Sequence, residues 1–260
     1  MTLTSSRLFA PFVVGLLGLA LWALMVDVLG IGTFFLPGPG DVVTAVGEGW
    51  EPIREAFRVT AANSLWGLAA GAVLGVLLAG IAATARLFDG MLGPLVAILA
   101  VVPIVAIAPL LYTMLGTDQE TPRRIIGAIA AFVPVFVNTL RGLRQTTALQ
   151  RDLMWTYAAG PVQRFRTVTL PVAIPFTLTG LRLAGSLAVI SALVAEYFGG
   201  VNNGLGSAIK NAATTNHARA FAYVGGAIVL GLLVFAITAA LERLARWAYP
   251  SRQAGPPEEK

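Results

Sequence analysis

The sequence has no cysteine, a single histidine (His217) and few charged residues. Without cysteine, the chain forms neither a disulfide framework nor a thiolate metal site. One histidine without a nearby cluster of carboxylates supplies too few ligands for a metal centre, so we expect no bound metal and no cofactor. Charged residues make up 12% of the chain, against about 25% in an average soluble domain. That supply is too small to cover a water-facing surface.

The sequence also lacks the motifs of nucleotide chemistry and of nucleophilic catalysis. No phosphate loop of the form G-x-x-x-x-G-K-[ST] occurs, so ATP, if it is used, must bind another polypeptide. His217 falls in an expected loop without a serine nucleophile motif, which excludes a Ser/His/Asp set. The net charge of +5 comes from basic residues scattered between apolar runs, a pattern that argues against nucleic acid. We therefore expect no enzyme activity in this chain.

Hydrophobic residues make up 57% of the chain and gather in long runs. Runs of about 20 residues favour membrane-spanning helices, because barrel strands would show shorter segments of alternating polarity. The prediction is an all-α integral membrane protein with about six spans in one domain, residues 1–260. The expected spans are residues 9–30, 63–85, 92–115, 125–140, 172–198 and 221–240.

The first run raises one alternative, a secretory signal peptide. Residues 9–30 are longer than a typical hydrophobic signal region and end at Asp27 and Gly30 without a small-residue cleavage pattern. A retained first helix is the preferred interpretation.

Glycine and proline are placed unevenly within the predicted spans. Gly67, Gly71 and Gly75 recur every four residues in the second span, a spacing that lets another helix approach closely. The third span contains Pro103 and Pro109, which free backbone carbonyls and bend a helix. A bent helix beside a pathway and a merely tolerated kink remain equally open interpretations.

The distribution of lysine and arginine predicts the orientation, because loops on the cytoplasmic side retain positive charge. If the N-terminus is inside, 12 of the 18 basic residues face the cytoplasm and 6 face outside. This bias favours both termini inside and places the segment 141–171 in the cytoplasm. Residues 36–58, which carry several charges, then form an external aqueous loop with a short surface helix.

The segment 141–171 is amphipathic, with Leu149, Leu153 and Tyr157 at four-residue spacing. It resembles the coupling loop of binding-protein-dependent ABC importer permeases. In that family the loop reads Glu-Ala-Ala, three residues, Gly, nine residues, an aliphatic residue, one residue and Leu-Pro. The quoted match is Asp152-Leu-Met-Trp-Thr-Tyr-Ala-Ala-Gly160, Arg164-Phe-Arg166 and Leu170-Pro171.

Anchoring the motif on Leu170-Pro171 puts Asp152 at the glutamate and Ala158 at the glycine. Gly160 then lies two positions beyond the expected glycine. The resemblance implies that the following residues couple the chain to an ATPase: Asp152, Leu153, Met154, Tyr157, Ala158, Gly160, Leu170 and Pro171.

Five further short pieces follow the family's order along residues 35–250. They are Leu36-Pro37-Gly38-Pro39, Val102-Pro103 with Ala108-Pro109, Val137-Asn138-Thr139, Gly180-Leu181-Arg182 and Ala195-Glu196-Tyr197. The resemblance implies a type I ABC importer permease fold in a bacterial inner membrane. The branch is similar to permeases for nitrate, sulfonates such as taurine, thiamine-precursor pyrimidines and riboflavin. It also implies two ATPase subunits, a second identical or related permease and an extracytoplasmic solute-binding protein as partners.

Four residues outside that segment are candidates for gating or structural roles: Glu196, Pro103, Pro109 and Asn138. Glu196 is an acid near the end of a span, where a structural or gating partner is favoured over direct substrate contact. A self-contained ion-coupled transporter or channel is the rival function. It would predict inverted repeats or charges near the bilayer midplane. An intramembrane enzyme is a third and weaker option.

Overall fold

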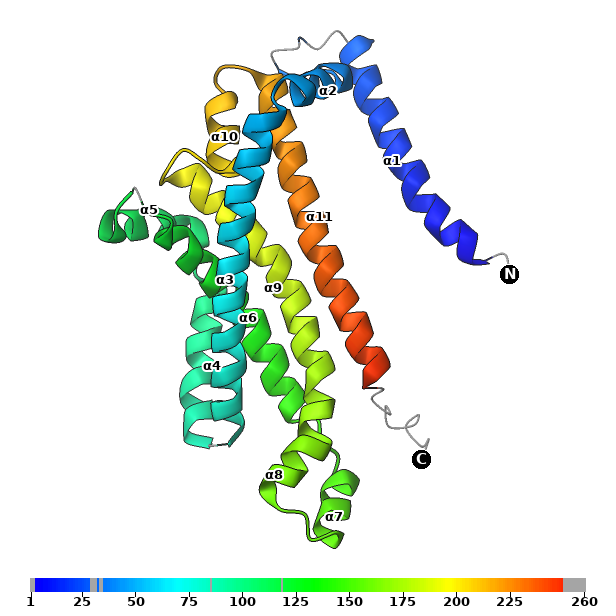
Figure 1. Ribbon diagram of the computed structural model, residues 1–260, viewed down its shortest axis with the longest axis vertical. Coiled ribbons are helices and arrows are strands. Elements are labelled where there is room, and N and C mark those ends of the chain that lie inside the picture. The colour runs from blue at the N-terminus through cyan, green and yellow to red at the C-terminus, as the bar shows by residue number, and fades with distance from the viewer. Residues whose placement is uncertain (1–2, 29–31, 33–34, 85, 118, 250–260) are drawn as a thin grey trace.

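The regular elements of the described chain are all helices (Figure 1). The computed structural model describes residues 3–28, 32, 35–84, 86–117 and 119–249. The helices are α1 (Leu3–Asp27), α2 (Pro39–Glu48), α3 (Trp50–Thr84), α4 (Arg86–Val101), α5 (Ile104–Leu115), α6 (Thr121–Leu143), α7 (Ala148–Thr156), α8 (Pro161–Arg164), the π-helical turn η1 (Phe165–Thr169), α9 (Leu170–Phe198), α10 (Leu205–Ala212) and α11 (His217–Ala248). The predicted all-α class is confirmed.

Four helices in the described residues are long and apolar enough to cross a membrane. They are α3, α6, α9 together with α8 and η1, and α11. They contain the predicted spans 125–140, 172–198 and 221–240 and the predicted span 63–85 as far as Thr84, since residue 85 lies outside the described residues. The short fourth span extends into its polar flanks, as expected. The sixth was predicted too short, because α11 continues through Ala248 and includes Glu242 and Arg246. The rest of the predicted polar tail, 250–260, lies outside the described residues.

The third predicted span, 92–115, is wrong as one continuous helix. The chain forms α4 and α5, which are bent by 102° relative to each other. Pro103 is the N-cap residue of α5 and has no N–H to continue the hydrogen bonding of α4. Pro109 lies inside α5 without breaking it. The break therefore follows from the first of the two prolines and not from the second.

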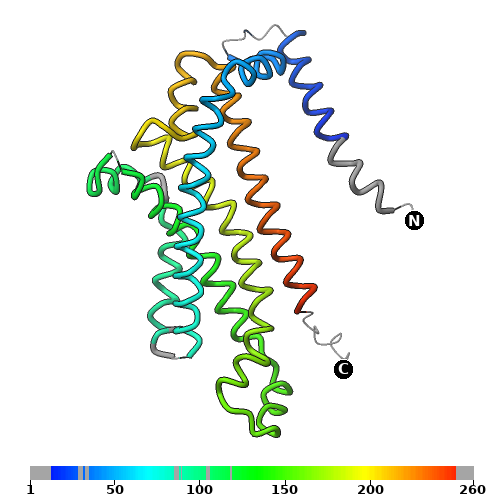
Figure 2. The backbone as a smooth tube through the Cα atoms, viewed as in Figure 1, coloured from blue at the N-terminus to red at the C-terminus, as the bar shows by residue number. Residues whose placement is uncertain are grey.

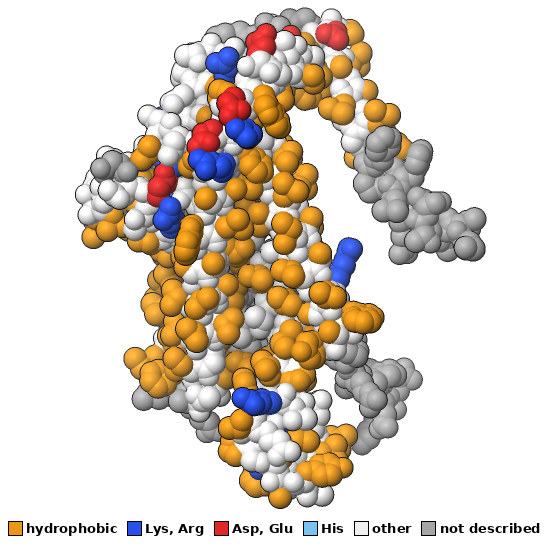
Figure 3. Space-filling view, in the orientation of Figure 1, with side chains coloured by type: hydrophobic (Ala, Val, Ile, Leu, Met, Phe, Trp, Pro, Cys, Tyr) orange, Lys and Arg blue, Asp and Glu red, His pale blue; other side chains and the backbone are white. Residues whose placement is uncertain are grey.

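The external loop predicted for residues 36–58 is also wrong in part. Pro39–Glu48 forms the expected short helix α2, but α3 already begins at Trp50. The charged side chains at the start of α3 lie on its exposed surface, where Arg54 pairs with Glu51 and Arg58 pairs with Glu55 at three-residue spacing. Figure 3 shows charged side chains along this part of α3 and hydrophobic ones along the lower lengths of α3 and α11.

The first predicted span, residues 9–30, falls largely within α1, which runs from Leu3 to Asp27. The predicted end at Gly30 lies outside the described residues. The Trp22 indole N–H donates to the carbonyl of Pro37 at 3.1 Å. Its ring lies 6.0 Å from that of Phe221, near the start of α11. The end of α1 is thus beside the start of α11. The beginning of α1 and the end of α11 point toward the same end of the bundle (Figure 1).

Helix α6 forms the centre of the bundle, packed between α3 and α9 (Figure 2). A Cβ atom placed on Gly71 would lie 2.4 Å from the carbonyl oxygen of Ala128, and one on Gly67 would lie 2.9 Å from Gly127. On the other side, a Cβ on Gly180 of α9 would lie 2.7 Å from the carbonyl oxygen of Pro134. The predicted small-residue face of the second span therefore contacts α6. Close packing at such a face stabilises the helix pair, because lipid supplies no hydrophobic drive for helices to associate.

The bundle has two ends, named here by the short helices that they carry. The α7 end holds α7 and α8, which Figure 1 shows below the lower ends of α3, α4 and α11. The α10 end holds α2, α10 and the start of α3.

Candidate functional site

Helix α7 starts with a reciprocal cap. The hydroxyl of Thr147 accepts a hydrogen bond from the backbone N–H of Gln150 at 3.2 Å, and the Gln150 side chain accepts one from the N–H of Thr147 at 2.9 Å. This capping box satisfies two donors that a helix start leaves unpaired. The first turn of the predicted coupling segment is therefore fixed by its own sequence.

The end of α7 is a Schellman motif centred on Ala158. The N–H of Ala159 donates to Met154 O at 3.0 Å, and the N–H of Ala158 donates to Trp155 O at 2.9 Å. Ala158 has a φ of 50° and is the one non-glycine residue with positive φ in the described chain. Gly160, in contrast, has an extended backbone with φ −69°. The position that favours glycine is thus 158, which is where the motif alignment placed it.

The apolar side chains of this segment divide into outward and inward sets. Tyr157 is 73% exposed and Leu153 is 46% exposed, although both are large and apolar or aromatic. Met154 is half-buried and lines a small hollow together with Trp155 and Arg164. Of the predicted coupling residues, Leu153 and Tyr157 are therefore available to a partner, and Met154 packs within the segment. Sequence reasoning did not include Leu149 and Trp155 among the coupling residues, yet both are exposed.

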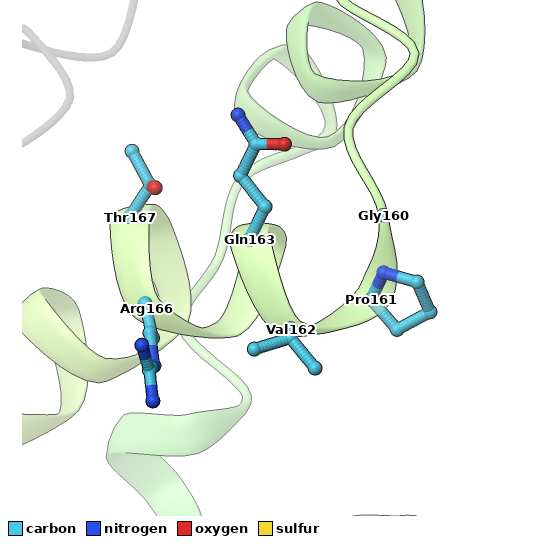
Figure 4. A pocket seen from close by; sticks show the side chains of 6 residues that line it. All are labelled: Gly160, Pro161, Val162, Gln163, Arg166 and Thr167. Atoms are coloured by element: carbon cyan, nitrogen blue, oxygen red, sulfur yellow. The ribbon is translucent and has the colours of Figure 1, made fainter.

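Arg164 ties α8 back onto α7. Its Nε donates to Ala159 O at 2.7 Å, and its guanidinium lies 3.9 Å from the centroid of the Trp155 ring. A stacked guanidinium and a backbone hydrogen bond hold the two short helices in one arrangement. Beside them lies an open hollow of about 550 Å³ around Pro161 and Arg166, shown in Figure 4.

The segment continues into the membrane helix without a loop. Helices α8 and α9 are joined by η1, in which the N–H of Leu170 bonds to Phe165 O. Pro171 follows directly and has no N–H to donate, and its ring would crowd the carbonyl four residues earlier in an ordinary α-helix. The wider π-helical turn relieves that conflict. The Leu170-Pro171 pair therefore does not end the helix, and the segment continues through it into α9.

At the α10 end, Glu196 is buried and serves as the anion at the start of α10. Its Oε2 accepts a hydrogen bond from Thr60 Oγ1 at 2.8 Å and one from the N–H of Gly206 at 3.0 Å. The N–H of Leu205 donates to Thr60 Oγ1 at 2.8 Å. A Cβ on Gly204 would lie 2.2 Å from the carboxyl carbon of Glu196, so only glycine fits there. Backbone N–H groups at a helix start suit a carboxylate. These contacts tie Glu196 of α9 to α3 and to the start of α10.

A second set of polar contacts surrounds Arg123, whose side chain is fully buried. Its guanidinium donates to Glu120 Oε2 at 3.0 Å, to Asn203 Oδ1 at 2.7 Å and to the carbonyl of Val201. It also lies 3.9 Å from Glu196 Oε1. We call Thr60, Asn63, Glu120, Arg123, Glu196 and Asn203 the outer network. It joins α3, α6 and α9 to the loop before α10, and sequence reasoning identified only Glu196 of its members as a candidate.

Glu120 precedes α6 and is the acidic centre of this network. It accepts hydrogen bonds from Asn63 at 2.6 Å and from Asn203 at 2.9 Å. Burial raises the pKa of the Glu120 carboxyl, but the hydrogen bond from Asn203, the charge of Arg123 and the hydrogen bond from Asn63 outweigh it. The pKa therefore lies below the usual value of 4.5. The carboxylate is ionised at neutral pH and holds the network together.

The remaining candidates occupy other parts of the bundle. The Asn138 amide donates to Pro134 O at 2.8 Å, and its Cβ would lie 3.0 Å from a Cβ on Gly180, so it lies at the contact between α6 and α9. Pro103 and Pro109 are exposed on or beside α5. The structure does not bring them together with Glu196 or Asn138. In the described residues no three His, Asp or Glu side chains gather as a metal site.

Comparison with known proteins identifies the family of this chain. The family described as binding-protein-dependent transport system inner membrane component matches residues 71–250. The chain belongs to that family. Its members are multi-pass proteins of the bacterial inner membrane and components of ABC transporters, and they are not themselves catalytic.

Relatives extend over most of the chain. A probable ABC transporter permease protein of Haemophilus influenzae is 30% identical over 77% of this chain and 81% of its own length. The formylaminopyrimidine transport permease protein ThiX of Halalkalibacterium halodurans is 29% identical over 92% of this chain and 96% of its own length. A putative aliphatic sulfonates transport permease protein SsuC of Bacillus subtilis is 28% identical over 86% of this chain and 78% of its own length.

Among solved structures, a chain of the MetNI methionine ABC transporter in an inward facing conformation matches with a TM-score of 0.54. It is 18% identical, and the match covers 76% of this chain and 94% of that chain. At this identity the likeness shows the fold, which is the type I ABC importer permease fold predicted from the sequence.

Proposed function

We propose that this chain is the membrane permease subunit of an ATP-driven importer. It passes a small solute into the cytoplasm, either a nitrate- or sulfonate-like anion or a small organic nutrient. Its relatives support this range, since their names include transport of aliphatic sulfonates, formylaminopyrimidine and nitrate. The chain supplies a path through the membrane, and ATP hydrolysis belongs to a separate subunit.

The observation that carries the proposal is the segment of α7 and α8 that extends from the bundle. Its two ends are fixed by the capping box at Thr147 and the Schellman motif at Ala158, and it still exposes Leu153 and Tyr157. Such side chains on a well-capped helix suit a groove on a soluble partner. We infer that an ATPase subunit binds there.

Continuity of the helix from Pro161 to Phe198 supplies the mechanical link. A push on α8 is carried along α9, which contacts α6 over much of its length and reaches Glu196 near its far end. Closure of an ATPase pair on two such segments would move α9 relative to α3, and the outer network joins these helices at the α10 end. Alternating access then follows from rigid helices, without chemistry in this chain.

The full assembly proposed here contains two permease subunits, identical or related, two ATPase subunits and an extracytoplasmic solute-binding protein. The α7 end faces the cytoplasm with both termini inside, and the α10 end faces the binding protein. Family membership and the α7 segment argue against a self-contained ion-coupled transporter or channel.

The test replaces the outward side chains and spares the inward one. The double variant Leu153→Ser/Tyr157→Ser removes two exposed anchors, and loss of such anchors at an interface costs about 2 kcal/mol or more. We expect normal amounts of permease in the membrane but loss of ATPase co-purification and of solute-stimulated ATP hydrolysis. Met154→Ser is the matched control, since it disturbs packing inside the segment. A well-expressed double variant that retains full solute-stimulated ATP hydrolysis would refute the proposal.

A further inference from the structure

A second buried carboxylate, Glu242 of α11, lies toward the α7 end and takes no part in the proposed coupling. Its Oε1 accepts hydrogen bonds from Thr179 at 2.6 Å and from Arg246 at 2.6 Å, and its Oε2 accepts one from Arg182 at 2.9 Å. The Glu242 side chain is 3% exposed, while those of Arg182 and Arg246 are 40% and 63% exposed. One buried anion therefore holds two guanidinium groups whose outer edges remain accessible.

Two neighbours on α11 add to this positive surface. Arg243 is exposed and makes no ion pair with any residue of the described chain, and Trp247 is 82% exposed. Arg246 and Trp247 follow Arg243 by three and four positions, so each of them lies beside Arg243 on the helix surface. Three arginines and one glutamate leave an excess of two positive charges. Arginine together with tryptophan at the end of a span is typical of a membrane–water interface.

The surroundings of this cluster are apolar and face outward. Leu183 on α9 and Leu232 and Phe235 on α11 are exposed, and the Arg182 guanidinium lies 5.2 Å from the centroid of the Phe235 ring. Figure 3 shows hydrophobic side chains along α11 above its lower end. A free anion in water gains nothing from such a surface. A molecule that joins an anionic head to long hydrocarbon chains would match both parts of it.

We propose that Arg182, Arg243 and Arg246 bind the phosphate of an anionic phospholipid. Its acyl chains lie along Leu232 and Phe235, which precede the arginines on the same side of α11, and Trp247 lies at the level of the headgroup. Glu242 does not touch the lipid but positions two of the arginines. This site lies outside the α7 segment and the outer network, so the inference requires the membrane placement of α9 and α11 and not the ATPase partner.

The experiment measures lipid binding to the purified, delipidated permease complex by native mass spectrometry. Phosphatidylglycerol is compared with phosphatidylcholine carrying the same acyl chains. We expect tighter binding of phosphatidylglycerol, and a loss of about fivefold in its affinity for Arg243→Gln and again for Arg246→Gln, the usual size for one basic residue near an anionic lipid. Arg54→Gln, which removes an exposed arginine from the opposite end, should leave the affinity unchanged.

Two further comparisons make the result decisive. Excess inorganic phosphate should not displace phosphatidylglycerol, because free phosphate lacks the acyl chains. The Arg243 side chain is exposed and makes no hydrogen bond or ion pair within the described residues, so the effect of Arg243→Gln reports on binding and not on folding. Any of three results would overturn the lipid site. They are equal affinity for the two lipids, unchanged phosphatidylglycerol binding in both Arg243→Gln and Arg246→Gln, and displacement of phosphatidylglycerol by inorganic phosphate.

Discussion

Thr60 on α3 and Glu196 on α9 are 136 positions apart and are joined by a buried hydrogen bond of 2.8 Å. The same hydroxyl accepts the N–H of Leu205 at the start of α10. One small side chain thus links two membrane helices and the cap of a third.

Thr60→Val keeps the shape of this side chain and removes both hydrogen bonds. Because the N–H of Leu205 and the carboxylate of Glu196 stay buried, we expect a destabilisation of about 1–3 kcal/mol, seen as a lower melting temperature of the solubilised protein. Thr44→Val on the exposed face of α2 is the control and should have almost no effect. Equal melting of Thr60→Val and wild type would show that this hydroxyl is not required at the α10 end.

Gly71 and Gly80 lie on the same helix and should respond to alanine with opposite signs. A Cβ on Gly71 would lie 2.4 Å from Ala128 O, whereas one on Gly80 would meet nothing within 4 Å. Gly71→Ala should therefore lower the melting temperature by overpacking α3 against α6, at a cost of about 1–3 kcal/mol. Gly80→Ala should raise stability slightly, because alanine favours a helix over glycine by roughly 0.5–1 kcal/mol. The same shift in both variants would contradict the close contact.

Ala158→Gly should stabilise the end of α7. Ala158 has a φ of 50°, a conformation that costs an L-residue roughly 1 kcal/mol and glycine little. The expected result is slower hydrogen exchange at the amides of residues 158 and 159, which close the Schellman motif. Gly160→Ala is the matched control. Its φ is −69°, no atom lies near its Cβ position, and we expect no change. Faster exchange in Ala158→Gly would disprove the cap.

Stability at the α10 end should fall in acid through Glu120. Its folded pKa lies below the usual 4.5, so the ionised form is favoured by folding. That contribution is present above the unfolded pKa and is lost as the pH falls through the folded pKa. The melting difference between wild type and Glu120→Gln should therefore be largest near pH 7 and shrink below about pH 4.5. Glu48→Gln, which removes an exposed carboxylate on α2, is the control. A difference independent of pH would exclude the carboxylate's charge as the cause.

Orientation can be tested directly in this cysteine-free chain. Arg151 and Asn202 are both exposed, at the α7 end and at the α10 end. In intact cells an impermeant thiol reagent should label Asn202→Cys and spare Arg151→Cys. The neighbouring Asn203 is not suitable for labelling, because its side chain bonds to Glu120 and Arg123. The opposite labelling pattern would reverse the proposed topology.

The sequence alone determined the features that depend on local composition and spacing. Hydrophobic run length predicted helices in a membrane, since a backbone in hydrocarbon must satisfy its own hydrogen bonds. Four-residue spacing predicted the glycine face of α3, and a short motif located the α7 segment. The motif alignment also put the family's glycine position at Ala158, whose φ is positive.

Only the tertiary structure decided the features made by residues far apart in the chain. The 102° bend between α4 and α5 depends on what each helix packs against after Pro103 interrupts the hydrogen bonding. The outer network requires Thr60, Arg123, Glu196 and Asn203 to meet, and no periodicity in the sequence encodes their distances. The Glu242 cluster likewise pairs α9 with α11. Burial of a charge is tolerable only where folding brings its partners within hydrogen-bond reach, so its role became visible only in the folded chain.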